Sequence, residues 1–145
     1  MIIAHAPLAG ALRAVAEHTF AEKMDRVVAL DIERDAVPEA MVLRARMLIS
    51  ELGEAEVLLL SDVYGATPFN VGRELADGIN QRLVTGVNVP MLWRALCYID
   101  EPLAKLVDRA VDGATQGVMQ VNSPRPQNQT SRNPSDDQDP RQHQQ

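Results

Sequence analysis

The sequence is short of several residue types, and each shortage excludes a class of protein. Cys97 is the only cysteine, so no internal disulfide can form, which fits a reducing compartment, and we expect this residue to be a small buried apolar group. Aromatic residues make up 3% of the chain, so the core must be aliphatic, as is common in α/β proteins. The sequence shows neither signal-peptide regions nor an apolar run of membrane-spanning length, so we expect a cytoplasmic protein without membrane insertion.

Positive charge is also scarce. The formal net charge is −6, and residues 1–121 hold 11 Lys and Arg against 17 Asp and Glu, whereas residues 122–145 hold three of each. An acidic body without a basic stripe argues against nucleic acid and is compatible with a basic protein partner. Residues 122–145 contain no apolar residue and four of the nine prolines. We therefore predict one domain over residues 1–121 and a disordered polar tail over residues 122–145.

Within residues 1–121, apolar patterns typical of strands and of helices alternate. The predicted strands are Ile2–His5, Val27–Ile32, Glu56–Leu60 and Leu83–Val87. The predicted helices are Leu8–Phe20, Pro38–Leu52, Pro68–Gly78, Met91–Ile99 and Leu103–Met119. This alternation predicts a doubly wound α/β fold with a mainly parallel four-stranded sheet, order 2-1-3-4, and helices on both faces. The first predicted strand is short and lies at the start of the sequence, which leaves open whether the true start codon lies upstream.

Two ionisable residues lie at the carboxyl ends of neighbouring strands of the predicted sheet. In open parallel sheets, reactive groups gather beyond the carboxyl ends of the strands, where the strand order reverses. His5 and Asp62 end the first and third strands, which flank that point. A carboxylate that accepts the imidazole N–H fixes its tautomer and stabilises developing positive charge, so the pair favours a nucleophilic histidine that carries a phosphoryl group. Taken singly, a histidine capping a strand and an aspartate forming a turn are the simpler interpretations.

The segment after Asp62 predicts an anion site. Thr67 followed by Pro68 is typical of a helix start, with a hydroxyl N-cap and proline at the first helical position. Such a helix presents free backbone N–H groups, and Gly65 lets the backbone come close to a ligand. Pro7 marks the start of the first helix, so a phosphoryl group on His5 is expected between two helix N-termini. Helix starts of this kind occur in every α/β protein, so they indicate function only together with the histidine.

Other polar residues are given simpler interpretations. Asn88 either hydrogen-bonds within the site or, more simply, stabilises its turn. His18 and His143, together with His5 and Cys97, show no metal-site spacing, and we predict no cofactor. A nucleotide-binding flavodoxin-like domain ranks last among the alternatives, because the sequence lacks a P-loop and the G-x-G-x-x-G pattern.

Three stretches together resemble the mannose-type enzyme IIA domain of the bacterial phosphoenolpyruvate-dependent sugar phosphotransferase system. They are Ile2–His5, Asp62–Asn70 and Gly86–Leu92, in the family's order and at matching spacing. The resemblance extends over residues 1–121, and its aspartate-to-asparagine stretch is the most specific. It implies a doubly wound α/β domain that forms homodimers and acts as a phosphotransferase through a phosphohistidine.

The resemblance also implies roles for individual residues. His5 would be phosphorylated by the phosphocarrier protein HPr, Asp62 would orient its imidazole, and Thr67, beside Gly65 and Ala66, would touch the phosphoryl group. The acceptor would be a separate IIB protein or a regulator, since no IIB sequence follows here. The alternative function is a non-catalytic regulatory or binding module that senses phosphorylation state. This alternative is favoured modestly because the residues on either side of His5 depart from the family pattern.

Overall fold

The computed structural model describes residues 1–122, so apart from Asn122 the predicted tail lies outside the described residues. The strands of this part are β1 (Ile2–His5), β2 (Ala29–Ile32), β3 (Val57–Ser61) and β4 (Gln81–Thr85). The helices are α1 (Leu8–Phe20), the 3₁₀ helix η1 (Ala21–Arg26), α2 (Pro38–Leu52), α3 (Thr67–Leu75), α4 (Val89–Cys97) and α5 (Leu103–Gln116).

The four strands form one parallel sheet in the order β2-β1-β3-β4, which confirms the predicted topology. The whole of β1 pairs with β2, but only Ile2 and Ile3 pair with β3. The ladder between β1 and β3 therefore ends before β1 does. This parting of the two central strands is the point at which the strand order reverses, and it opens at their carboxyl ends.

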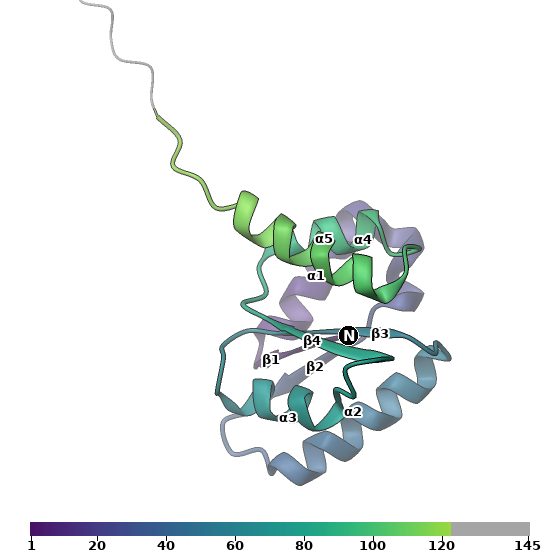
Figure 1. Ribbon diagram of the computed structural model, residues 1–145. Helices are drawn as coiled ribbons and strands as arrows, with labels where there is room; N and C mark the ends of the chain where they lie inside the picture. The colour runs from purple at the N-terminus through teal and green to yellow at the C-terminus, as the bar shows by residue number, and fades with distance from the viewer. Residues whose placement is uncertain (123–145) are drawn as a thin grey trace, which may run out of the picture.

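Helices cover both faces of the sheet, as predicted. Figure 1 shows α1, α4 and α5 on one side of the strands and α2 and α3 on the other. Side chains of β3 alternate between the two cores: Leu58 and Leu60 pack beneath α1, α4 and α5, whereas Leu59 packs beneath α2 and α3. Within the part of the chain that the structure describes, no helix is both long and apolar enough to cross a bilayer.

Local sequence signals account well for α2. Pro38 occupies its first turn, where proline needs no hydrogen-bonding N–H. Gly53 follows the helix with φ 66°, a left-handed conformation that glycine adopts without steric cost, and its N–H donates to the carbonyl of Ser50. Both ends of the predicted helix are thereby confirmed.

Several predicted boundaries are wrong by a few residues, and two have clear causes. The helix predicted over Pro68–Gly78 ends at Leu75, because the Asp77 carboxylate accepts three backbone N–H groups, those of Ile79, Asn80 and Gln81, and folds the chain into a turn. The strand predicted over Leu83–Val87 begins two residues earlier, at Gln81, because its backbone already pairs there with β3.

Two further features differ from expectation. The segment Ala21–Arg26, which carried no predicted element, forms η1 between α1 and β2. Cys97 is exposed and not a buried apolar group, because it is the last residue of α4 and lies on the outward side of that helix.

Candidate functional site

The parting of β1 and β3 brings His5 and Asp62 together. The His5 Nδ1 atom lies 2.7 Å from Asp62 Oδ2, and the His5 backbone N–H donates to the same oxygen at 2.9 Å. Where the ladder ends, the Asp62 side chain thus takes the place of a backbone carbonyl of β3. The two residues are 57 positions apart in the chain, and the sheet topology alone makes them neighbours.

The Asp62 carboxylate is ionised and holds the imidazole in one tautomer. Burial alone would raise the pKa of this carboxyl, but hydrogen bonds from the His5 backbone, the His5 ring and the Val63 N–H outweigh it and keep the pKa below 3.8. An ionised carboxylate only accepts hydrogen bonds, so Nδ1 of His5 must carry the ring proton. In the neutral ring, the lone pair then lies on Nε2.

The imidazole is open to solvent while its partner is not. The His5 side chain is 52% exposed, whereas that of Asp62 is 9% exposed. Within residues 1–122, no hydrogen bond reaches Nε2. The ring is thus anchored at one nitrogen and presents the other, which can act as a nucleophile toward a group arriving from solvent.

The turn between β3 and α3, which begins at Asp62, supplies unpaired backbone donors. Among the described residues, the N–H groups of Tyr64, Gly65, Thr67 and Phe69 have no hydrogen-bond acceptor, and neither does the Thr67 hydroxyl. Gly65 has φ 79°, which turns the backbone in a way that other residues rarely adopt. The N–H of Ala66 differs from these, because it donates to the carbonyl of Val63 at 3.3 Å. Unpaired amides at a helix N-terminus form a site suited to an anion.

The start of α3 differs from the prediction by one residue. Thr67 was expected to be the N-cap, but Ala66 holds that position, because its carbonyl accepts the first helical hydrogen bond, from Asn70 N–H at 3.0 Å. Thr67 is instead the first helical residue, and its hydroxyl caps nothing. The correction leaves that hydroxyl free for other partners.

The N-terminus of α1 is less open to an anion than expected, because a carboxylate already occupies part of it. At its N-terminus, the Asp31 carboxylate accepts the N–H of Ala9 at 2.8 Å and that of Gly10 at 3.2 and 3.3 Å. These donors are therefore unavailable to a phosphoryl group. Asp31 was missed by the sequence interpretation, and the available signal was an acidic residue inside an otherwise apolar strand, one position before its carboxyl end.

The third stretch of the resemblance has a structural part in this arrangement. Asn88 caps α4 by accepting the Met91 N–H at 2.8 Å, and its amide donates to the carbonyl of Ala114 on α5 at 3.3 Å. The residues before it extend the sheet, since the N–H of Gly86 donates to the Asp62 carbonyl at 2.9 Å. Asn88 thus follows the simpler of its two predicted roles, and the segment holds the backbone of Asp62.

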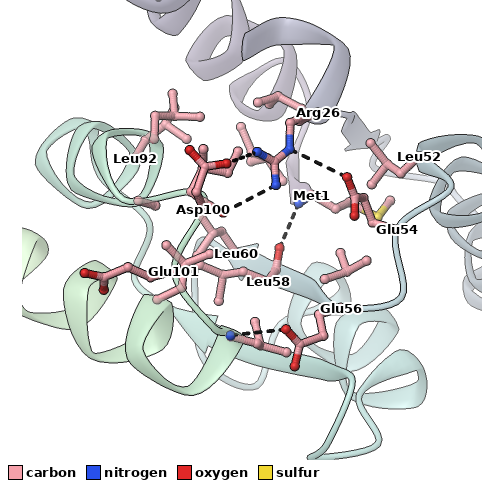
Figure 2. Close-up of a pocket in the computed structure, with 18 of the residues that line it drawn as sticks. Met1, Arg26, Leu52, Glu54, Glu56, Leu58, Leu60, Leu92, Asp100 and Glu101 are labelled. Carbon is pink, nitrogen blue, oxygen red and sulfur yellow. Dashed lines mark hydrogen bonds and ion pairs between the residues drawn. The ribbon is translucent and has the colours of Figure 1, made fainter.

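A cavity of about 450 Å³ lies far from this site, at the amino ends of the strands. Figure 2 shows the Arg26 guanidinium between Asp100 and Glu54, and the amine of Met1 on the carbonyl of Leu58. The carboxylate of Glu56 accepts the backbone N–H at the start of α5. These polar groups are engaged in ion pairs or in hydrogen bonds to the backbone, and among the residues that line the cavity there is no pair comparable to His5 and Asp62.

The sequence matches a known protein family over most of its length. Residues 1–111 match the family model described as the PTS system fructose IIA component, EIIA-man, where PTS stands for the phosphotransferase system. The chain belongs to this family. As a IIA protein, it is a component of a sugar phosphotransferase system, and its general role is phosphotransfer. The comparison with curated proteins gave no match.

Solved structures of IIA proteins share the fold. The mannose/sorbose-specific IIA subunit from Enterococcus faecalis matches with a TM-score of 0.74 at 20% identity, covering 85% of this chain and 93% of that one. The EIIA component from Streptococcus agalactiae matches with a TM-score of 0.70 at 24% identity, covering 82% of this chain and 93% of that one. The IIA protein associated with the fucose utilization operon of Streptococcus pneumoniae matches with a TM-score of 0.69 at 24% identity, covering 82% of this chain and 89% of that one.

Proposed function

We propose that this chain is a cytoplasmic phosphocarrier that accepts a phosphoryl group from HPr on Nε2 of His5. The observation that carries the proposal is the contact of 2.7 Å between His5 Nδ1 and an Asp62 carboxylate that keeps its charge. In the transfer, the Nε2 lone pair forms the new N–P bond while the bond to the donor's phosphohistidine breaks. The positive charge that develops on the ring is stabilised by Asp62.

The turn before α3 supports the same proposal from the side of the phosphoryl group. The free N–H groups of Gly65 and Thr67, with the Thr67 hydroxyl, would receive the oxygens of a phosphoryl group on Nε2. Ala66 would contribute to the shape of this turn more than to donation, because its own N–H is already engaged. These contacts would offset part of the negative charge of the phosphoryl group.

The surface around the site supports docking of a protein partner. Val63 and Tyr64 directly follow Asp62 and are 56% and 77% exposed, and the Tyr64 ring packs on Phe69 with centroids 4.6 Å apart. Exposed aromatic and aliphatic side chains beside a reactive group are typical of a docking surface. The acidic body, residues 1–121, suits a basic partner such as HPr.

The proposed acceptor of the phosphoryl group is a separate IIB protein or a regulator that reads the phosphorylation state of His5. The geometry at His5 is compatible with either acceptor, because the N–P bond on Nε2 forms in the same way in both cases. A purely non-catalytic module on this scaffold remains the alternative function. The half-exposed ring and its ionised partner favour transfer over that alternative.

Phosphorylation of His5 can be measured directly by intact-protein mass spectrometry. Incubation with phosphoenolpyruvate, enzyme I and HPr should add about 80 Da to the wild-type chain, and omission of HPr should abolish the gain. His5→Ala should show no gain, whereas His18→Ala, which removes an exposed imidazole of α1, should behave as wild type. A His5→Ala protein that still gains 80 Da would end the proposal.

A further inference from the structure

The turn that carries His5 is held at both of its ends by carboxylates. At one end, Asp62 accepts the His5 N–H, and at the other, Asp31 accepts the N–H groups of Ala9 and Gly10. Asp31 belongs to β2 and Asp62 directly follows β3, and these two strands are the neighbours of β1 on either side. Between the clamped ends, the chain runs through only a few residues.

Asp31 reaches the helix because the sheet register and a glycine allow it. In the pairing of β1 with β2, Asp31 lies opposite Ala4, the residue before His5. A Cβ atom added to Gly10 would lie 2.8 Å from Asp31 Oδ2, closer than such atoms approach in proteins. Glycine at position 10 therefore makes room for the carboxylate at the start of α1.

We propose that Asp31 is a positioning residue for His5, an inference that rests on the proposed phosphocarrier function. By fixing the first turn of α1 it sets where β1 ends and α1 begins, and so where the His5 ring meets Asp62. It also occupies the N-terminus of α1 with its own negative charge. The turn before α3, whose N–H groups have no acceptor among residues 1–122, then offers more free donors to a phosphoryl group on Nε2 than the start of α1 does.

This role differs from that of an ordinary helix cap. A cap that only stabilises α1 affects the fraction of folded protein, and leaves the rate of each folded molecule unchanged well below the unfolding temperature. A positioning residue changes that rate and the tautomer of His5 in protein that is fully folded. The two roles therefore give different results in the same set of variants.

The test combines variants that disturb the contact from each side. Asp31→Ala removes the carboxylate, Gly10→Ala displaces it, and Asp31→Asn keeps an oxygen that accepts the same N–H groups. Because alanine is a better helix former than glycine, Gly10→Ala should slow transfer without a matching loss of helix. Asp108→Asn, an exposed residue on α5, is the charge-matched control.

Two measurements are made on folded protein at 25 °C. The first is the rate of His5 phosphorylation by phosphorylated HPr at increasing HPr concentration. We expect kcat to fall about 10- to 100-fold in Asp31→Ala and Gly10→Ala with little change in KM, as is usual for a misplaced reacting group. Asp31→Asn should recover most of the rate, and Asp31→Ala with Gly10→Ala should be no slower than Asp31→Ala alone.

The second measurement is the ¹⁵N NMR spectrum of the His5 ring, which does not depend on transfer. Wild type and Asp31→Asn should show the Nδ1–H tautomer, and the two alanine variants a mixture of tautomers. If wild type is not phosphorylated, the proposed function fails, and the ring spectra still decide the role of Asp31. If wild-type rates and an unchanged tautomer are found in Gly10→Ala and in folded Asp31→Ala, the positioning role is overturned.

Discussion

At the scale of single residues, the site depends on one carboxylate that serves three donors. Asp62 binds the His5 backbone, the His5 ring and its own neighbour Val63. These bonds keep it ionised although its side chain is nearly buried, and an ionised partner is what a histidine needs as it becomes positively charged. The same hydrogen bonds therefore position the imidazole and keep its partner Asp62 charged.

Asp62→Asn should keep the fold and slow phosphoryl transfer to His5 by between about 10²- and 10⁴-fold. The amide keeps a single acceptor oxygen and carries no charge, and its NH₂ group can donate to Nδ1, so it no longer fixes the ring tautomer. The measurement is the single-turnover rate from phosphorylated HPr, with Asp108→Asn as the control for loss of an exposed charge. Unchanged rates in Asp62→Asn would remove Asp62 from the mechanism.

The same variant should also lose a pH-dependent part of its stability. Because the folded-state pKa of Asp62 lies below 3.8, its ionised form favours the folded state above about pH 4, and this contribution is lost as the pH falls through the folded pKa. The urea midpoints of wild type and Asp62→Asn should therefore differ most near neutral pH and draw together as the pH falls below about 4. A difference that grows on acidification would contradict the assigned direction of the shift.

At the scale of helices and strands, close packing of α4 on α5 is set by glycine. A Cβ atom added to Gly113 would lie 2.5 Å from the Arg94 Cβ and 2.8 Å from the Pro90 carbonyl oxygen. Neither atom belongs to the flexible end of a side chain, so the helices would have to move apart. Together with α1, these two helices cover one face of the sheet, and the distance between them affects the packing of the core beneath.

Gly113→Ala should therefore destabilise the protein, although alanine is the better helix former. Overpacking costs about 1–3 kcal/mol and the gain in helix propensity is about 1 kcal/mol, so the free energy of unfolding should fall by up to about 2 kcal/mol. Urea denaturation of wild type and Gly113→Ala at pH 7 measures this change in the free energy of unfolding. Asp108→Ala, at an exposed position of the same helix, should change stability by less than about 0.5 kcal/mol, and a stabilised Gly113→Ala would refute the packing argument.

The sequence predicted elements where side chains decide them and failed where backbone pairing does. The apolar run of β3 and the glycine after α2 were sufficient signals, because a buried strand requires apolar residues and a left-handed turn favours glycine. The start of β4 at Gln81 has no such signal in the sequence, because its pairing with β3 is made by backbone groups. Asp31 was missed for a related reason: its target on α1 depends on register, which apolar spacing does not encode.

At the scale of the whole molecule, we expect two copies of the chain to associate. β4 is an edge strand in the described part of the chain, and a hollow beside it is lined by residues of β4, α4 and α5 and by Val118. Val118, Met119 and Val121 are 75%, 71% and 83% exposed just beyond α5. An open sheet edge beside exposed aliphatic residues is a surface that a second copy would cover.

Met119→Asp with Val121→Asp should shift the protein from dimer to monomer in light scattering coupled to gel filtration. Leu43→Asp with Met47→Asp is the matched control, because these aliphatic residues are also exposed but lie on α2, across the sheet from α5. His5, Asp62 and the turn before α3 all come from one chain, so the monomeric variant should still accept a phosphoryl group on His5. A wild-type protein that is monomeric at about 100 µM would contradict the expected association. Dissociation caused by the α2 pair instead would place the association surface on the other side of the sheet.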